Sequence, residues 1–343
     1  MALCTTFINS GKRVKVSIIG AGVAGLTCAC ELLDRGITVD LYERSEYLGE
    51  TACSWYAGGM LAPWCERESA EQTVVDLGME AFNWWDQHVS SFQQRGSLVL
   101  SMQRDKRDIE RFARLTEQHR WLDSSEIGAL EPEFLGRFER GLFYPQEAHL
   151  DPRQAMHQLA TYLRDRSVEI HYGAEVQAED CNSDRVIDCS GFSARNQLPG
   201  LRGVKGEMLV LKTTEISLSR PVRLVHPRYP IYIVPRDDNL FMLGATMIEN
   251  EHRGSVTARS MLELLSAAYA LHPAFAEAEI VESGVDLRPA YADNQPRLYR
   301  KDNVIYVNGL FRHGFLLSPA MARQVADAIL DEQKYSELNL CAS

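Results

Sequence analysis

The chain has 343 residues, of which 45% are hydrophobic and 24% charged, and its formal net charge is −11 at pH 7. The length suits two domains, the acidic balance argues against a nucleic-acid partner because phosphate binding needs a basic face, and no apolar run approaches the roughly 18 residues that span a bilayer. Eight cysteines are scattered without a CxxC pair, which indicates reduced thiols in the cytoplasm and no structural metal site.

The first predicted unit is a complete βαβ unit. Residues 1–13 form an extension ahead of a β-rich run, Val14 to Ile19, which ends in the glycine motif GAGVAG at residues 20–25. A helical pattern of apolar residues follows. A second strand, Ile37 to Tyr42, then ends at Glu43. This order is typical of a Rossmann-type nucleotide-binding fold.

The glycine motif carries the strongest local chemistry. Gly20 permits a tight turn, Gly22 lets the backbone approach a pyrophosphate, and Gly25 lets the helix pack on the strand. The helix N-terminus offers free N–H groups to the phosphates. Glu43 can accept hydrogen bonds from ribose hydroxyls and would repel a 2′-phosphate, so NADP is disfavoured. The competing interpretation is a glycine-rich turn without a ligand.

The middle of the chain has mixed signals. Residues 66 to about 120 read as mostly helical. Asp151-Pro152 then predicts a helix N-cap followed by proline at the first helical position, with the helix running to about Arg166. Short strands are expected at Val168 to His171 and at Val186 to Cys189.

The pattern changes again after residue 204. Antiparallel strands are expected at Met208 to Leu211, Ile231 to Val234 and Leu240 to Leu243. A helix from about Ala258 to Leu271, a strand at Val304 to Val307 and a last helix from about Ser318 to Leu330 follow, with Ser318 as its expected cap.

The C-terminal segment favours a flavin over a nicotinamide. Residues 309–319, GLFRHGFLLSP, end a strand and open a helix, and a helix N-terminus stabilises the negative charge of a reduced flavin. The alternative is a loop that only closes the sheet. We therefore predict an α/β fold in which a Rossmann-type FAD-binding domain, residues 14–65, 150–203 and 285–335, carries an inserted antiparallel-sheet α+β substrate domain, residues 66–149 and 204–284.

Seven stretches carry a family resemblance. They are IIGAGVAGL at 18–26, SWYAGGMLAPWCERE at 54–68, HLDP at 149–152, GVKGEML at 203–209, YIVPRDDNLFMLGATM at 232–247, LRPAYADNQP at 287–296 and NGLFRHGFLLSPA at 308–320. Together they resemble the D-amino-acid-oxidase superfamily of FAD enzymes and, within it, the glycine-oxidase branch that serves thiamine biosynthesis. They span nearly the whole chain in the expected order.

The resemblance implies which residues bind non-covalent FAD. The expected cofactor-binding residues are Gly20, Gly22, Val23, Ala24, Gly25, Glu43, Arg44, Cys53, Ser54, Gly58, Gly59, Met60, Val176, Leu310, Phe311, Arg312, His313, Gly314, Phe315 and Leu316. The pair Cys53-Ser54 is commonly two hydroxyl residues in the family, so Cys53 departs from the pattern. Val176 is expected on a strand beside the adenine.

Three residues are implied on the substrate side. Arg288 falls where the family holds the substrate carboxylate, and arginine can do so with two parallel hydrogen bonds. Tyr232 falls where a tyrosine hydroxyl shares that carboxylate, and Arg312 could contact substrate or the flavin edge. Each residue also has an interpretation without a functional role. Arg288 could form a surface ion pair, Tyr232 could be a half-buried strand tyrosine, and Arg312 could be a solvent-exposed charge.

The resemblance implies oxidation of glycine or another small amino acid, with molecular oxygen as electron acceptor and imine or 2-oxo acid, ammonia and hydrogen peroxide as products. A D-amino-acid or N-methylglycine oxidase, a quinone-linked dehydrogenase, a nicotinamide dehydrogenase and a non-catalytic flavoprotein stay open as alternatives. A homo-oligomer is also compatible with the sequence.

Overall fold

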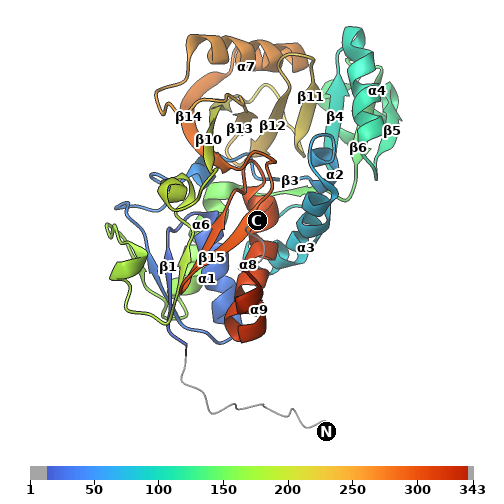
Figure 1. Ribbon diagram of the computed structural model, residues 1–343. Helices are drawn as coiled ribbons and strands as arrows, with labels where there is room; N and C mark the ends of the chain where they lie inside the picture. Colours follow the sequence, from blue (N-terminus) through green and yellow to red (C-terminus); the bar gives the residue numbers. More distant parts are fainter. Residues whose placement is uncertain (1–13, 339–343) are drawn as a thin grey trace.

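The molecule has two stacked parts, each built on its own large sheet (Figure 1). The computed structural model describes residues 14–338, so the expected N-terminal extension lies outside the described residues. In Figure 1 the lower part holds one sheet with helices α1, α6 and α8, and helix α7 lies across the top of the upper sheet. The mixed α/β architecture agrees with the predicted fold class.

The lower sheet is six-stranded, with the order β15-β16-β9-β1-β2-β8. Its strands are β1 (Val16–Ile19), β2 (Val39–Tyr42), β8 (Ile170–His171), β9 (Arg185–Asp188), β15 (Arg297–Lys301) and β16 (Val304–Asn308). All neighbours are parallel except β15 and β16. Every residue of β1 is buried, as expected for a parallel strand that is covered on both faces.

Helices cover this sheet and connect it to the upper part. They are α1 (Val23–Asp34), α2 (Pro63–Glu66), α3 (Gln72–His88), α6 (Pro152–Arg164), α8 (Gly314–Leu330) and α9 (Glu332–Glu337). The predicted cap of α6 is confirmed, because the Asp151 carboxylate accepts hydrogen bonds from the N–H groups of Arg153 and Gln154. A two-stranded ribbon of β3 (Met60–Leu61) and β7 (Ala148–His149) lies alongside.

The upper sheet is eight-stranded, with the order β14-β10-β13-β12-β11-β4-β6-β5. Its strands are β4 (Ser97–Ser101), β5 (Arg120–Asp123), β6 (Arg140–Tyr144), β10 (Arg202–Lys212), β11 (Val222–Val225), β12 (Ile231–Arg236), β13 (Leu240–Gly244) and β14 (Glu279–Ala290). Only β4 and β11 pair in parallel among the described strands of this sheet.

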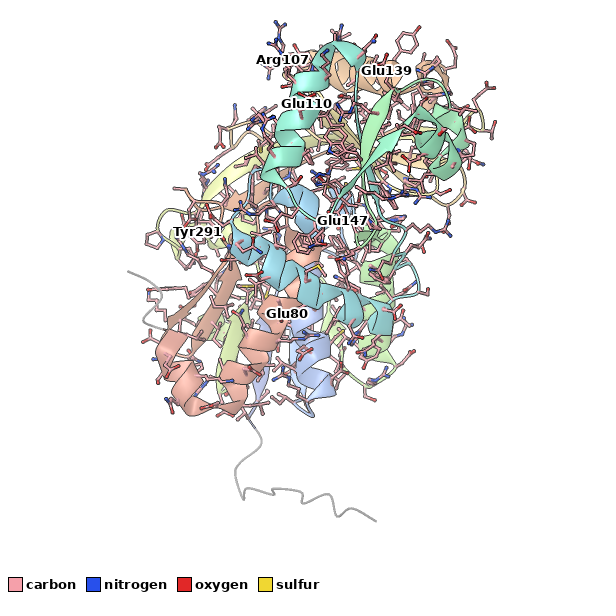
Figure 2. The ribbon with its side chains drawn as sticks, turned by 90° about the vertical axis from the view of Figure 1, so that its right-hand side faces the viewer. Glu80, Arg107, Glu110, Glu139, Glu147 and Tyr291 are labelled. Carbon is pink, nitrogen blue, oxygen red and sulfur yellow. The ribbon has the colours of Figure 1, made fainter. Side chains whose placement is uncertain are left out.

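Three helices accompany the upper sheet: α4 (Lys106–Leu115), α5 (Ser124–Leu130) and α7 (Ala258–Leu271). Helix α7 has the predicted bounds and buries Leu264, Ala268 and Leu271 against the sheet core. Figure 2, turned by 90°, shows α4 with Arg107 and Glu110 on the outer side of this part. Short 3-10 turns complete the chain at η1 (Cys53–Tyr56), η2 (Gln103–Asp105), η3 (Pro132–Phe134), η4 (Ala178–Asp180), η5 (Gly191–Asn196) and η6 (Pro273–Ala276).

The expectation that residues 66 to about 120 are mostly helical is wrong in part. Helices α3 and α4 lie there, but so do strand β4 and the start of β5. All five residues of β4 are buried, because the strand lies inside the sheet and both of its faces are covered. Its sequence therefore lacks the alternation that marks a half-exposed strand.

The expected start of the last helix is also wrong. Helix α8 begins at Gly314, and Ser318 lies inside it, where its hydroxyl donates to the Gly314 carbonyl at 2.6 Å. Pro319 has no N–H to offer the carbonyl four residues earlier. That carbonyl, on Phe315, instead accepts a hydrogen bond from the indole N–H of Trp85 at 2.8 Å, so the helix continues through the proline.

Smaller differences concern strand bounds. The first two strands begin two residues later than predicted, at Val16 and Val39. Val176 lies in a loop, not on a strand. The triplet Leu287-Arg288-Pro289 belongs to β14, a strand of the upper sheet that the sequence pattern did not reveal.

Candidate active site

A cavity of about 860 Å³ opens between the β1–α1 turn of the lower part and strands β10, β12 and β14 of the upper part. Ligand cavities of proteins commonly have volumes of this order. Every candidate site residue predicted from the sequence lines it except Gly25. Residues from both ends and the middle of the chain therefore meet at one place.

The glycine turn has the tight geometry that was expected. Gly20 has φ +94°, a left-handed conformation that favours glycine, and a β-carbon on Gly25 would lie 1.8 Å from the Gly20 carbonyl oxygen. Gly22 is different, since a β-carbon there would make only an ordinary contact, 3.5 Å from Ser54 Oγ. Packing within the described protein therefore does not require glycine at position 22. A ligand that lies in the cavity directly against the backbone would require it.

Glu43 is held at the end of β2 by two backbone groups. Its Oε2 accepts from the Ala21 N–H at 2.8 Å and its Oε1 from the Ser45 N–H at 3.0 Å. A carboxylate offers about four acceptor sites, so this one can also accept from a ribose. Arg44 is exposed and donates to Ser193 Oγ at 3.0 Å.

The segment from Cys53 to Met60 forms another wall of the cavity. Ser54 Oγ accepts from the Val23 N–H at 3.1 Å, which ties this wall to the start of α1. Burial raises the pKa of the Cys53 thiol to about 12, so it is a neutral group. Gly58 and Gly59 are required by packing, because β-carbons on them would lie 2.6 Å from the Tyr232 ring and 2.1 Å from the Leu150 carbonyl oxygen.

Residues 310–316 form the opposite wall. Phe311 adopts φ +51°, and its N–H donates to the Pro289 carbonyl at 2.9 Å. This hydrogen bond fixes the segment to the strand that carries Arg288. Helix α8 starts here without a side-chain cap, so its first N–H groups are left for a ligand.

These observations fit a dinucleotide cofactor such as FAD. A turn with an open glycine at 22, a buried acid at the end of β2 and a second helix N-terminus surround one continuous cavity. The proposed binding set stays as predicted, except that Gly25 serves the packing of α1 on the turn and Val176 would contact the cofactor from a loop.

Arg288 and Tyr232 come together on the cavity face of the upper sheet. The Arg288 guanidinium lies over Gly206, with Cζ 2.4 Å from where a β-carbon would stand, and its Nη1 donates to the Thr246 carbonyl at 2.9 Å. The Tyr232 hydroxyl lies over Gly244, 2.7 Å from the corresponding position. Burial raises the pKa of Tyr232, so its hydroxyl is a neutral donor.

Arg312 lines the cavity but is engaged by protein groups. Its Nη2 lies 2.6 Å from Glu66 Oε2 and 2.6 Å from Ser69 Oγ. Glu66 also pairs with Arg223 on β11. Neither Glu66 nor Arg223 was predicted, although Glu66 lies within the conspicuous motif at residues 54–68 and could have been considered as a partner for a cavity arginine.

Comparison with known proteins identifies the class. Residues 15–328 match the model of the FAD dependent oxidoreductase family, DAO, so the chain belongs to that family and FAD is its cofactor. A thiamine biosynthesis oxidoreductase ThiO of Rhizobium etli is 54% identical over 325 residues, which cover 94% of this chain and 99% of that protein.

Other relatives are more distant. A glycine oxidase of Bacillus licheniformis is 25% identical over 93% of this chain and 94% of its own length. The solved structure of a glycine oxidase from Geobacillus kaustophilus superposes with a TM-score of 0.79 at 23% identity, over 92% of this chain and 94% of that one. The structural likeness establishes the shared fold. Within residues 14–338, no helix is both long and apolar enough to cross a membrane.

Proposed function

We propose that the protein oxidises glycine or another small amino acid. The observation that carries this proposal is the pair Arg288 and Tyr232, which converge over two glycines on one face of the cavity that fits FAD. A guanidinium and a neutral hydroxyl at one point form a binding site for a carboxylate. The names of the relatives from Rhizobium etli and Bacillus licheniformis support the same substrate class.

The protein's own contribution is orientation. Arg288 would hold the carboxylate with two parallel hydrogen bonds, and the Tyr232 hydroxyl would donate a third. This arrangement fixes the Cα–H bond relative to the wall formed by residues 310–316. FAD, when bound, supplies the two-electron acceptor. The substrate loses a hydride from Cα and a proton from nitrogen, and water hydrolyses the imine to a 2-oxo acid and ammonia.

Molecular oxygen is the proposed final electron acceptor, giving hydrogen peroxide. From the name of the Rhizobium etli relative we also infer a role in thiamine biosynthesis in the cytoplasm, where the imine would be the useful product. The FAD is proposed to be non-covalent, held by the residues that surround the glycine turn, Glu43 and the start of α8.

Anaerobic mixing of the yellow holoprotein with glycine tests the function directly. Loss of the oxidised flavin absorbance, followed by peroxide when air is admitted, is the expected result. A panel with N-methylglycine, D-alanine and L-alanine defines the preference. Flavin reduction that only a quinone reverses would indicate a dehydrogenase, and a flavin that no amino acid reduces would contradict the proposal.

A further inference from the structure

A second cationic position lies beyond Tyr232, on the side away from Arg288. Here the carboxylate of Glu66 contacts the guanidinium groups of both Arg223 and Arg312, and His313 Nδ1 lies 3.5 Å from it. All four side chains line the same cavity as Arg288. Arg223 and Glu66 keep only 16% and 10% of their side-chain surface exposed.

This cluster carries a net positive charge. Burial would raise the pKa of Glu66, but Arg312 and Arg223 hold it well below its usual range, so the carboxylate is ionised. Burial lowers the pKa of His313 to about 4, which leaves the imidazole neutral at pH 7. Two guanidinium groups therefore face one carboxylate. Glu147 also faces Arg223, but burial raises its pKa to about 7, so it offsets only part of the excess charge.

Arg223 has hydrogen-bonding capacity left over. Its Nη2 donates to Glu66, and its Nη1 makes no hydrogen bond with a described residue. Its Nε also has no partner, but protein atoms close it off from the cavity. A guanidinium has five N–H donors in a planar fork, and a buried donor without a partner is costly. A ligand carboxylate in the cavity would be an acceptor for Nη1.

The sheet places Arg223 and Arg288 at opposite ends of one face. Arg223 on β11 is the direct cross-strand partner of Tyr232 on β12, and such partners project to the same side. The Arg288 guanidinium stands over Gly206 on β10, three strands away from β11. Three strand spacings amount to roughly 14 Å. A dicarboxylic substrate that extends across β13 and β12 would therefore place one carboxylate at each arginine.

Building on the proposed function, we propose that Arg223 forms a second anion subsite, which binds an additional carboxylate of the amino-acid substrate. Arg288 and Tyr232 hold the α-carboxylate, and the second carboxylate lies beyond the tyrosine. It can be on a carboxymethyl group attached to the substrate nitrogen or at the end of a side chain. The substrate class is thereby extended from small neutral amino acids to dicarboxylic ones.

Paired probes that differ in one charge test this subsite in the holoprotein. N-(carboxymethyl)glycine is compared with its amide, N-(carbamoylmethyl)glycine, and D-glutamate with D-glutamine, which separates the two attachment points. Binding is read independently of turnover, by the change in flavin absorbance when glutarate or its monoamide is added. We expect the acid to be preferred at least tenfold in kcat/KM for one of the pairs, and in Kd for glutarate.

Substitution then assigns the preference to Arg223. Arg223→Gln should reduce the ratio of acid to amide to about threefold or less, and Arg223→Lys should keep part of it because the charge remains. Arg111→Gln is the matched control, since Arg111 lines the same cavity but is 61% exposed and paired with Glu68; it should retain the preference.

The outcomes separate this inference from the function on which it rests. If the unsubstituted protein shows the same kcat/KM and Kd for each acid and its amide, the proposed subsite does not exist. This comparison does not depend on the folding of a variant. A preference that survives in Arg223→Gln or is lost equally in Arg111→Gln overturns the assignment to Arg223. Failure of glycine to reduce the flavin contradicts the proposed function alone, because glutarate binding is measured without turnover.

Discussion

The guanidinium of Arg288 occupies the space that a side chain at Gly206 would fill. Its Cζ and Nη2 both lie 2.4 Å from the position of a β-carbon on that glycine. Gly206 lies on β10, where it pairs with Asp286, two residues before Arg288 on the neighbouring strand. The missing side chain therefore allows the arginine to lie flat over the sheet and to reach towards Tyr232.

Gly206→Ala should displace Arg288 without unfolding the protein, because the obstructed atoms belong to the end of a flexible side chain. We expect kcat/KM for glycine to fall roughly ten- to a hundredfold, which corresponds to about 1.4–2.8 kcal/mol, mainly through KM. FAD content should not change. Gly203→Ala adds the same methyl group to the opposite face of β10 and is the control; a similar loss there would contradict the proposed contact.

Arg288→Ala should leave the substrate carboxylate in the cavity without its partner. Removing one member of a buried charge pair costs about 3–5 kcal/mol, or two to four powers of ten in kcat/KM. Lysine should restore activity only in part, since it cannot form the two parallel bonds. Steady-state kinetics with FAD occupancy checked decide the result.

The matched control for Arg288 is Arg107→Ala, an exposed arginine on α4 (Figure 2). It should behave like the unsubstituted protein. A loss below about tenfold in Arg288→Ala, with FAD retained, would show that the carboxylate is held elsewhere.

Glu43→Ala should weaken FAD binding. Losing a hydrogen bond with a charged partner costs about 1–3 kcal/mol, and the two N–H groups that Glu43 now satisfies, on Ala21 and Ser45, would also lose their acceptor. The Kd of FAD for the apoprotein measures the effect, and the Tm of the apoprotein separates loss of fold from loss of ribose binding. Glu50→Ala, an exposed acid on the same loop, should bind FAD normally.

Local signals in the sequence predicted several elements of both parts well. The β1–α1–β2 unit, the Asp151 cap and helix α7 depend on neighbouring residues, and each was recognised from them. Strand β4 was missed because burial on both faces removes its periodicity. Helix α8 was predicted too short. Pro319 leaves the Phe315 carbonyl without its helical donor, and the donor that replaces it is the indole N–H of Trp85, more than two hundred residues away in the chain.

The residues of the candidate site likewise fall into those that the sequence predicted and those that it did not. Residues in contiguous motifs, such as those around Gly20 and Leu310, could be predicted to meet. The Glu66–Arg223–Arg312 cluster could not, because Arg223 and Glu66 are 157 residues apart and only the sheet order brings them together. The domain boundaries and the individual FAD contacts stay predictions.

Glu147 provides a test of buried charge next to the site. Its carboxyl lies in the interior between the two parts (Figure 2), with Oε1 accepting from the Cys65 N–H at 2.7 Å. Burial raises its pKa to about 7 from an ordinary value near 4.5. Between pH 4.5 and 7 the unfolded chain releases this proton while the folded protein keeps it, so this group makes the protein less stable as pH rises.

Glu147→Gln should remove the loss of stability that the Glu147 carboxyl causes as pH rises. The glutamine carbonyl can still accept from Cys65, and the side chain stays neutral at every pH. The free energy of unfolding of the variant minus that of the parent should therefore increase from pH 4.5 and level off above about pH 7, by up to about 3 kcal/mol. His149 and His313, whose pKa values burial lowers to about 4, raise stability with pH over the same range. They are present in both proteins and cancel in the difference.

Urea unfolding at pH 5, 6, 7 and 8 with saturating FAD measures this difference in the free energy of unfolding. Substitution of the exposed Glu139 by Gln is the control. A difference that does not change with pH would show that Glu147 is ionised in the folded protein at pH 5.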